Sequence, residues 1–341
     1  FLNLFLRTYR QHADHILHNY SKQGNHLLFE AQRMLFAGIY FPEFREAQEW
    51  RRSGIEILNR EIGVQVYPDG MQFELDFGYH IAAIDIFLKA LGMARANGYE
   101  GEFPASYIET VGKMTAVTCN LLFPDWSNPM FGDTKSHDKS SLQRQFRSWS
   151  KVFPGDKQLQ WFATEGRKGA LPDYTSQQFP ESGFYVLRSG WDADATVMVL
   201  KAGPQGFWHC QPDNGTFELW HRGRNFFPDS GCFSYGGTSS SNADRRKYAA
   251  STAHNTVTLD NKNVSSDGKM LKQFSKSGSG HSYQALVLEN PSYEGLTHRR
   301  TIFMVDDKFY VILDEAYGSA AGTVNLNFNI TEGTDAQVVY D

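Results

Sequence analysis

The chain has 341 residues, enough for two domains, and its 41% hydrophobic and 14% aromatic content supplies ample material for packed cores. A formal net charge of -5 argues against general nucleic-acid binding, so a polyanionic partner would have to meet a local positive field. Three cysteines, Cys119, Cys210 and Cys232, form no even framework and lack metal-finger spacing, so we expect them to be packing residues.

Residues 1–171 carry helical periodicity. Five stretches have apolar residues at helical spacing: 1–20, 25–41, 45–66, 79–98 and 105–123. Their short connections predict antiparallel helical hairpins. The chain starts inside a helical pattern, without a methionine, a signal peptide or an apolar run of about 18 residues that would span a membrane. We therefore expect it to be a segment of a longer protein.

From about residue 179 the hydrophobic pattern changes to period two. Eight strands are predicted, at 184–189, 195–202, 216–221, 255–260, 283–289, 298–305, 309–316 and 323–330. An all-helical half followed by an all-β half predicts an α+β multidomain protein, with domains at 1–171 and 172–341. We expect a cleft between them, which is a preferred place for a ligand.

The stretch 207–232 combines polar groups with turn signals. The turns at 213–215 and 228–231 flank an alternating apolar run and predict a hairpin that brings His209 and Asp229 towards one end of the sheet. Gln211, Asp229 and His254 would then converge on a divalent cation, and their oxygen and nitrogen donors suit zinc and calcium about equally. The alternative is that Asp229 only closes a turn and His254 is a core histidine.

Two helix starts carry further candidate residues. Asn25 and His26 open the second predicted helix, where free backbone N–H groups and the helix dipole favour an anion. The alternative role for Asn25 is an N-cap. Tyr79 and His80 open the fourth predicted helix, and the alternative there is a half-buried tyrosine with a bonded hydroxyl.

The polar inventory favours one kind of chemistry. The sequence shows no carboxylate pair set up as acid and base, no glycine-rich phosphate loop and no Gly-x-Ser-x-Gly elbow. Asn, Tyr and His together suit proton abstraction beside a carboxylate whose charge is neutralised, as in β-elimination at a uronic acid.

Five motifs carry a family resemblance. GNHLLFEA, DGMQFEL with the following YH, HCQPDNGTFELW, FPDSG and AHNTVTLD resemble the heparinase II/III group of polysaccharide lyases, most closely heparinase III of polysaccharide lyase family 12. The resemblance implies an incomplete (α/α) toroid followed by an antiparallel β-sandwich, in a bacterial periplasmic or secreted enzyme. It also implies cleavage of heparan sulfate by β-elimination, which leaves 4,5-unsaturated uronate ends.

Matched position by position, the resemblance implies roles for six residues. Asn25 would neutralise the substrate carboxylate, and Tyr79 and His209 would be catalytic. Gln211, Asp229 and His254 would hold one divalent metal ion that fixes the strand presenting His209. Relatives often carry His-x-His where this chain has His209-Cys210-Gln211, and an amide oxygen in place of imidazole leaves calcium or zinc open.

Substrate contacts are predicted for His26, His80, Arg246 and Tyr248. Arg246 belongs to a run of cations that flanks the site in sequence, formed by Arg222, Arg224, Arg245, Arg246 and Lys247. Arginine suits carboxylate and sulfate groups, although most such runs are only a solvated face.

Other functions stay open at this point. Alginate lyase is the runner-up activity, and a non-catalytic glycan-binding module or a metal-dependent hydrolase are alternatives from other classes. We expect an acidic polysaccharide as the partner, no nucleic acid, no membrane and a monomer.

Overall fold

The computed structural model describes residues 1–234, 239–264, 269–278 and 281–333. The backbone groups into two compact units. Unit 1 comprises Phe1–Phe73 and Tyr79–Ala116, and unit 2 comprises Glu74–Gly78 and Val117–Asp341.

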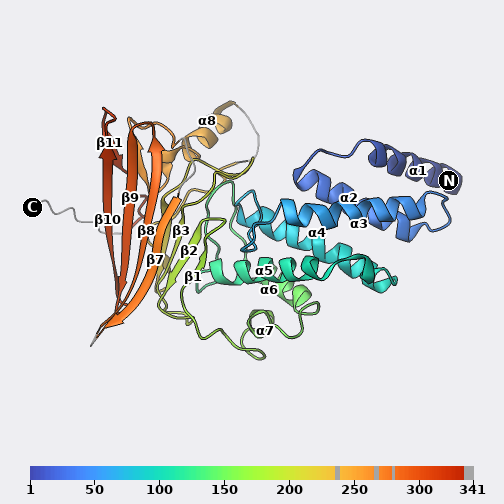
Figure 1. Ribbon diagram of the computed structural model, residues 1–341, viewed down its shortest axis with the longest axis horizontal. Coiled ribbons are helices and arrows are strands. Elements are labelled where there is room, and N and C mark those ends of the chain that lie inside the picture. Colours follow the sequence, from blue (N-terminus) through green and yellow to red (C-terminus); the bar gives the residue numbers. More distant parts are fainter. Residues whose placement is uncertain (235–238, 265–268, 279–280, 334–341) are drawn as a thin grey trace, which may run out of the picture. The chain divides into compact units, whose positions relative to one another are not determined.

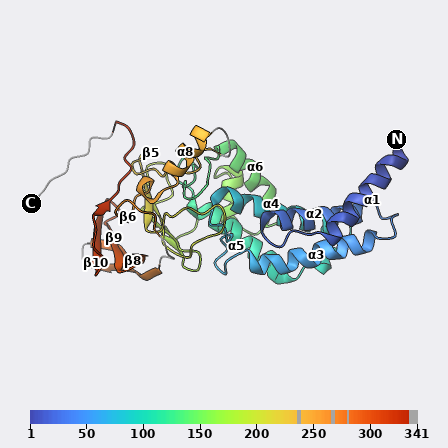
Figure 2. The same cartoon turned by 90° about the horizontal axis from the view of Figure 1, so that it is seen from above.

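Unit 1 is helical, as the periodicity predicts (Figure 1). It contains most of the five long helices α1 (Leu2–His18), α2 (Gly24–Tyr40), α3 (Ala47–Val64), α4 (Phe77–Ala96) and α5 (Ala105–Leu121), together with the short 3-10 helix η1 (Glu100–Glu102). Helices α2 and α3 lie side by side in both views (Figures 1 and 2). A Cβ on Gly54 would lie 2.4 Å from the Ala31 carbonyl oxygen, so glycine allows the two backbones to touch.

Helix α4 corrects one expectation from the sequence. It is the one helix among the described residues that is long and apolar enough to cross a membrane by length and composition. However, 61% of its most apolar window is buried, and Ile84, Phe87 and Leu91 are almost completely covered. This burial is what the core helix of a folded domain shows.

Unit 2 adds two helices that the apolar periodicity did not predict, α6 (Lys139–Trp149) and α7 (Lys157–Thr164). Each begins at an aspartate whose carboxylate accepts a backbone N–H of the first turn, Asp138 from Ser141 and Asp156 from Leu159. Further along the chain, α8 (Ser239–Tyr248) and the 3-10 helix η2 (Ser251–Ala253) interrupt the strands.

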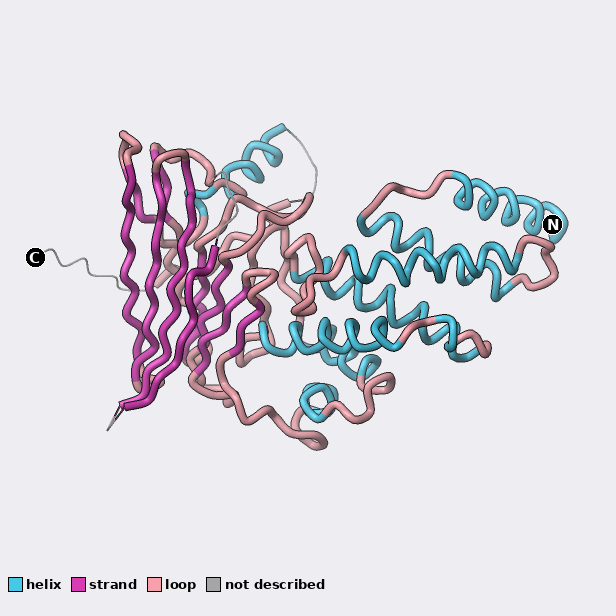
Figure 3. The backbone as a smooth tube through the Cα atoms, viewed as in Figure 1, coloured by secondary structure: helices cyan, strands magenta, loops and turns pink. Residues whose placement is uncertain are grey.

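The strands of unit 2 form two larger antiparallel sheets and a two-stranded ribbon (Figure 3). The five-stranded sheet runs in chain order through β1 (Gln177–Phe179), β2 (Phe184–Arg188), β3 (Val197–Lys201), β4 (Thr216–His221) and β5 (Arg224–Asn225). The four-stranded sheet has the order β10 (Phe309–Gly318), β9 (Leu296–Val305), β8 (His281–Tyr293), β7 (Lys269–Gly278), and the ribbon pairs β6 (Val257–Leu259) with β11 (Val324–Leu326).

The two larger sheets share one hydrophobic core. Tyr185, Met198 and Phe217 from the first sheet pack with Leu286 and Ile302 from the second, and all five are completely buried. Two antiparallel sheets facing each other across a common core is the layering that period-two patterning predicts.

The predicted hairpin has a different turn. Arg222 and Gly223, with φ of 45° and 81°, make the tight connection between β4 and β5. Residues 213–215 instead end a long connection from β3, and 228–231 follow β5. The predicted positions of the hairpin turns are therefore wrong, although the predicted strand between them, β4, is present.

The boundary between helices and strands falls between α7 and β1, close to the predicted boundary after residue 171. The compact units divide earlier, between Ala116 and Val117, and within unit 2 Arg188 of β2 reaches back to the end of α5. Its buried guanidinium donates to the carbonyl oxygens of Asn120 at 3.2 Å and Leu122 at 2.6 Å. These bonds satisfy carbonyls that a helix end leaves unpaired.

Candidate functional site

His209 lies on the connection between β3 and β4, with a carboxylate facing each ring nitrogen. Its Nδ1 is 3.4 Å from Asp133 Oδ2, and its Nε2 is 3.6 Å from Glu74 Oε2. The His209 side chain keeps 20% of its surface exposed, whereas those of Asp133 and Glu74 are 5% and 0% exposed. The imidazole is therefore the accessible member of a buried acidic cluster.

Asp133 joins this cluster to Gln211 and to α8. Its Oδ1 accepts the Gln211 amide N–H at 3.0 Å, and its Oδ2 accepts a hydrogen bond from Arg245 of α8. Burial opposes the charged carboxylate, but the hydrogen bonds from His209 and Gln211 and the Arg245 guanidinium lower the pKa of Asp133. Asp133 is therefore an anion at neutral pH.

A buried ion pair holds the connection that carries His209. Lys201, at the end of β3, donates to Asp213 Oδ1 at 2.6 Å and lies 3.0 Å from the Cys210 sulfur. Asp213 Oδ2 accepts the Gly132 backbone N–H at 3.1 Å. The Asp-Asn-Gly segment thus anchors two loops to each other. Cys119 and Cys232 are buried, as expected of packing residues, and Cys210 is half-buried.

A cavity of about 330 Å³ opens beside this cluster within unit 2. Polar, cationic and aromatic side chains line it: Asp133, Trp208, Cys210, Gln211, Pro212, Asn242, Arg245, Arg246 and Ala249. Trp208 is 57% exposed and has a φ of 31°, a backbone conformation that a bulky residue rarely adopts. Such strain is typical of functional sites, where the surrounding structure holds it.

Arg246 and Tyr248, predicted to bind substrate, both lie on α8, and both are exposed. Arg246 lines the cavity. Tyr248 stacks on Phe233 with ring centroids 4.8 Å apart, and its carbonyl accepts the Ser230 hydroxyl at 2.7 Å. Arg224 differs from these, because its guanidinium donates to the backbone carbonyls of Thr331 and Glu332.

The candidate metal ligands lie in the same unit. His254 Nδ1 is 2.7 Å from Asp229 Oδ2, and Gln211 donates to the carbonyl of Gly231, two residues after Asp229. His254 therefore does not point into an apolar core. Although complete burial opposes a charged imidazole, the Asp229 carboxylate raises the pKa of His254.

Two buried atoms of this set have no hydrogen-bond partner in the part of the chain that is described. They are Gln211 Oε1 and His254 Nε2, a carbonyl-type oxygen and a ring nitrogen. Buried polar atoms normally have a partner, so these two fit a cation as ligands. Among the described residues no three His, Cys, Asp or Glu side chains group so as to hold a metal ion.

The candidate residues at the starts of α2 and α4 differ in how far they are buried. Helix α2 begins at Gly24 with Gln23 as its N-cap, so Asn25 is not the cap. Asn25 and Tyr79 are half-buried and His26 is exposed.

His80 corrects a prediction. It is completely buried, its Nε2 donates to the Met114 carbonyl at 2.9 Å, and its Nδ1 accepts the Gln72 backbone N–H at 3.2 Å. Burial lowers the pKa of His80 to about 4, so the ring is neutral. With both nitrogens occupied, His80 is a core histidine and the prediction of substrate contact is wrong.

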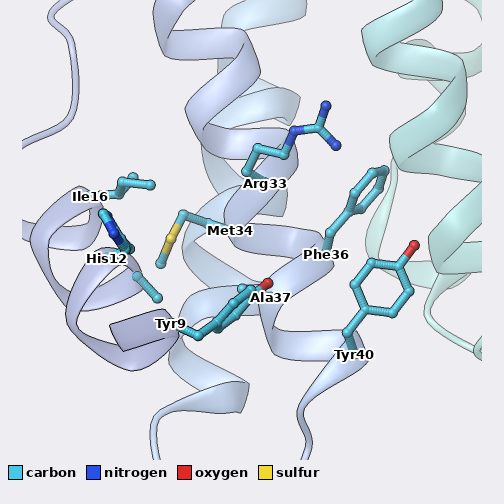
Figure 4. Close-up of a pocket in the computed structure, with 9 residues that line it drawn as sticks. Tyr9, His12, Ile16, Arg33, Met34, Phe36, Ala37 and Tyr40 are labelled. Carbon is cyan, nitrogen blue, oxygen red and sulfur yellow. The ribbon is translucent and has the colours of Figure 1, made fainter. Parts of the chain in front are cut away.

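Unit 1 has a cavity of its own, of about 250 Å³, between α1 and α2 (Figure 4). Tyr9, Ile16, Met34 and Phe36 make much of its wall, and the Arg33 guanidinium extends away from Tyr9 and Met34. The wall is mainly apolar, unlike that of the cavity in unit 2.

Two family models together match almost the whole chain. The model described as "Heparinase II/III N-terminus" matches residues 1–161, and "Heparinase II/III-like, C-terminal" matches residues 172–340. The heparin-sulfate lyase of Bacteroides stercoris is 52% identical over 333 residues, which are 98% of this chain and 50% of the relative. The heparin-sulfate lyase of Pedobacter heparinus is 46% identical over 341 residues, 100% of this chain and 51% of the relative.

Solved structures agree with these matches. A heparinase III shares 53% identity at a TM-score of 0.90, over 99% of this chain and 52% of that one. The heparan sulfate lyase HepC from Pedobacter heparinus shares 46% identity at a TM-score of 0.85, over 97% and 52%. The chain belongs to the heparinase II/III family, as its motifs predict, and it spans about half the length of the curated relatives that it matches.

Two residues of the site had no signal in the sequence. Glu74 lies inside the DGMQFEL motif, where no spacing marks it as part of a site, and Asp133 lies in an irregular segment between α5 and α6. Each is far from His209 along the chain, and only the tertiary fold brings them together.

Proposed function

We propose that this chain cleaves heparan sulfate-type glycosaminoglycan by β-elimination at uronic acid. The observation that carries the proposal is the His209 cluster beside a cavity lined by Arg245 and Arg246, in a chain about half identical to heparin-sulfate lyases. Guanidinium groups match the planar, anionic carboxylate and sulfate groups of such a polymer.

The proposed chemistry uses an amide, a phenol and an imidazole. Asn25, with His26 beside it, hydrogen-bonds the uronate carboxylate, which makes the hydrogen on C5 acidic. Tyr79, reacting as the phenolate, takes that proton and becomes a neutral phenol as the C4=C5 double bond forms and the C4–oxygen bond breaks. The departing glycosidic oxygen receives a proton from the same phenol. His209 assists as a second base or by polarising the tyrosine, and each such group contributes about 10²–10⁴ in rate.

Substrate recognition is assigned to the cations and aromatics of unit 2. Arg246 would bind a sulfate or carboxylate in the cavity that it lines, and Tyr248 would contact a sugar ring from its exposed stack with Phe233. Support for the second assignment is the exposure of both rings.

The proposed cofactor is one divalent cation, calcium or zinc, held by Gln211, Asp229 and His254. It would fix the turn after β5 and the connection that carries His209, without touching substrate. The unpartnered Gln211 Oε1 and His254 Nε2 support this proposal.

The proposal also covers the fold class of the helical and strand-rich parts of the chain. We infer that the helices of residues 1–171 are part of an (α/α) toroid and that residues 172–341 are an antiparallel β-sandwich domain. The family models, which divide between residues 161 and 172, support this boundary. We further propose a monomer in the bacterial periplasm or outside the cell, with no membrane or nucleic-acid partner.

The test is an ultraviolet assay on this chain. Elimination makes a conjugated 4,5-unsaturated uronate, so absorbance should rise with heparan sulfate and stay flat with the His209→Ala variant. Alginate in the same assay tests the runner-up activity. New reducing ends without absorbance would indicate a hydrolase, and retention of the polymer without either product would indicate a binding module. Either outcome would refute the proposal.

A further inference from the structure

We propose that Asp133 is a positioning residue that sets the orientation of both His209 and Gln211. This inference rests on the proposed function for its catalytic consequence. Its structural content lies entirely within unit 2 and is tested separately below.

A hydrogen bond between backbone groups holds Asp133 next to His209. The Asp133 N–H donates to the His209 carbonyl at 2.9 Å. The neighbouring Gly132 has a φ of 71°, and a Cβ there would lie 2.7 Å from the same carbonyl oxygen. Only glycine allows this approach, so the two loops touch at a fixed register. The carboxylate of Asp133 is thereby aimed at the His209 ring.

The carboxylate then selects one form of the imidazole. Both oxygens of Asp133 act as acceptors, Oδ1 from Gln211 and Oδ2 from Arg245, and Oδ2 faces His209 Nδ1 at 3.4 Å. Glu74 Oε2 lies farther from the ring, 3.6 Å from Nε2, so we infer that a neutral His209 carries its hydrogen on Nδ1, towards Asp133, and exchanges protons at Nε2. Partners of this kind set the tautomer and orientation of a histidine ring.

The other oxygen of Asp133 orients the Gln211 amide. Gln211 Nε2 donates to Asp133 Oδ1 at 3.0 Å and to the Gly231 carbonyl at 3.3 Å, so both of its hydrogens have acceptors. The amide cannot flip without placing its oxygen against two acceptors. Consequently Oε1 points elsewhere, and it is the atom that has no partner among the described residues. Asp133 thus leaves Gln211 with a ligand oxygen available.

Arg245 completes the arrangement from α8. Its guanidinium pairs with Asp133 Oδ2 and also lines the cavity. The pair helps to keep the carboxylate charged, and it links the position of α8 to the His209 cluster.

The first experiment reads the tautomer without activity. Ring nitrogens of ¹⁵N-histidine-labelled chain are recorded by NMR, and the His209 signals are those missing from His209→Gln. Wild-type chain should show the hydrogen on Nδ1, and Asp133→Asn should change this pattern. A wild-type hydrogen on Nε2 would overturn the proposal, even if Asp133→Asn does not fold. An unchanged pattern in a folded Asp133→Asn chain would also overturn it.

The second experiment separates positioning from stability. In Asp133→Asn, kcat should fall about 10–100-fold with KM within about twofold, the range seen when a partner of a functional histidine is removed. Asp138→Ala is the matched control, because Asp138 caps α6 in the same interhelical segment. It should lower the melting temperature and leave kcat unchanged. An equal loss of kcat in both variants would reduce Asp133 to a structural residue.

The two proposals fail in distinguishable ways. Absence of elimination by the wild-type chain would refute the proposed function, while the tautomer comparison would still decide the role of Asp133. Calcium or zinc binding, followed by calorimetry, tests the Gln211 half of the inference. Affinity about 10–100-fold lower in Asp133→Asn is expected, and equal affinity in both chains would contradict it.

Discussion

The ion network between β9 and β10 gives a stability prediction whose size follows from the structure. Asp314 accepts from Arg300 at 2.7 and 3.1 Å and lies 2.7 Å from His298 Nε2. Burial opposes the charged carboxylate, but the His298 hydrogen bond and the Arg300 guanidinium lower the pKa of Asp314 from 3.8 to about 2. That difference corresponds to about 2 kcal/mol of unfolding free energy at neutral pH.

Asp314→Asn should therefore destabilise unit 2 by about 2–4 kcal/mol at pH 7, because it also leaves the fully buried Arg300 without its counter-charge. The folded-state pKa lies below the unfolded value, so this stabilisation is complete above pH 4 and lost as the pH falls towards 2. The difference between wild type and variant should shrink to about half by pH 3.

Urea unfolding followed by tryptophan fluorescence is a suitable assay, since six of the seven tryptophans lie in unit 2. Lys262→Met is the control, because its ion pair with Asp260 is exposed and should change stability by less than about 0.5 kcal/mol. A difference for Asp314→Asn that stays constant between pH 7 and pH 3 would refute the reasoning.

Three further predictions concern the site. Tyr79→Phe should melt like wild type but lose elimination by about 10²–10⁴-fold, and a variant that keeps most of its rate would remove the tyrosine from the mechanism. Asp229→Ala should lower both the melting temperature and the activity, and chelation of wild-type chain should lower the melting temperature similarly; an unchanged melt in both would contradict a structural cation. Arg246→Ala should raise KM and weaken its salt dependence, whereas Arg222→Ala, on the β4–β5 turn, should change neither; equal effects would indicate a general charge effect.

The hydrophobic periodicity predicted most of the fold, because the side chains that each helix and strand buries set that periodicity. The five long helices and the strands β2, β3, β4, β6, β8, β9, β10 and β11 overlap the predicted stretches. Helix α8 could not be predicted in this way. Its sequence, SSSNADRRKY, has no apolar stripe, so neither period appears in it. Arg245 and Arg246 therefore lie on a helix that the hydrophobic pattern does not predict.

The error at His80 has a geometric cause. Consecutive residues of a helix point about 100° apart and do not share a face, so a role for Tyr79 does not extend to His80. In α4 the tyrosine is half-buried and the histidine faces the core. Asp133 is far in sequence from the residues that it contacts. Its partners His209, Gln211 and Arg245 lie 76 to 112 positions further along the chain. No local pattern encodes contacts at that separation.

The hydrogen bonds from Arg188 to the end of α5 determine where an expressed fragment of this protein should begin. An expressed fragment that starts at residue 172, where the second family model begins, would keep the guanidinium and discard both of its carbonyl acceptors. A buried cation exposed in this way invites aggregation or local unfolding of β2. A fragment beginning near residue 117 retains both acceptors and is the better choice for crystallising the strand-rich part alone.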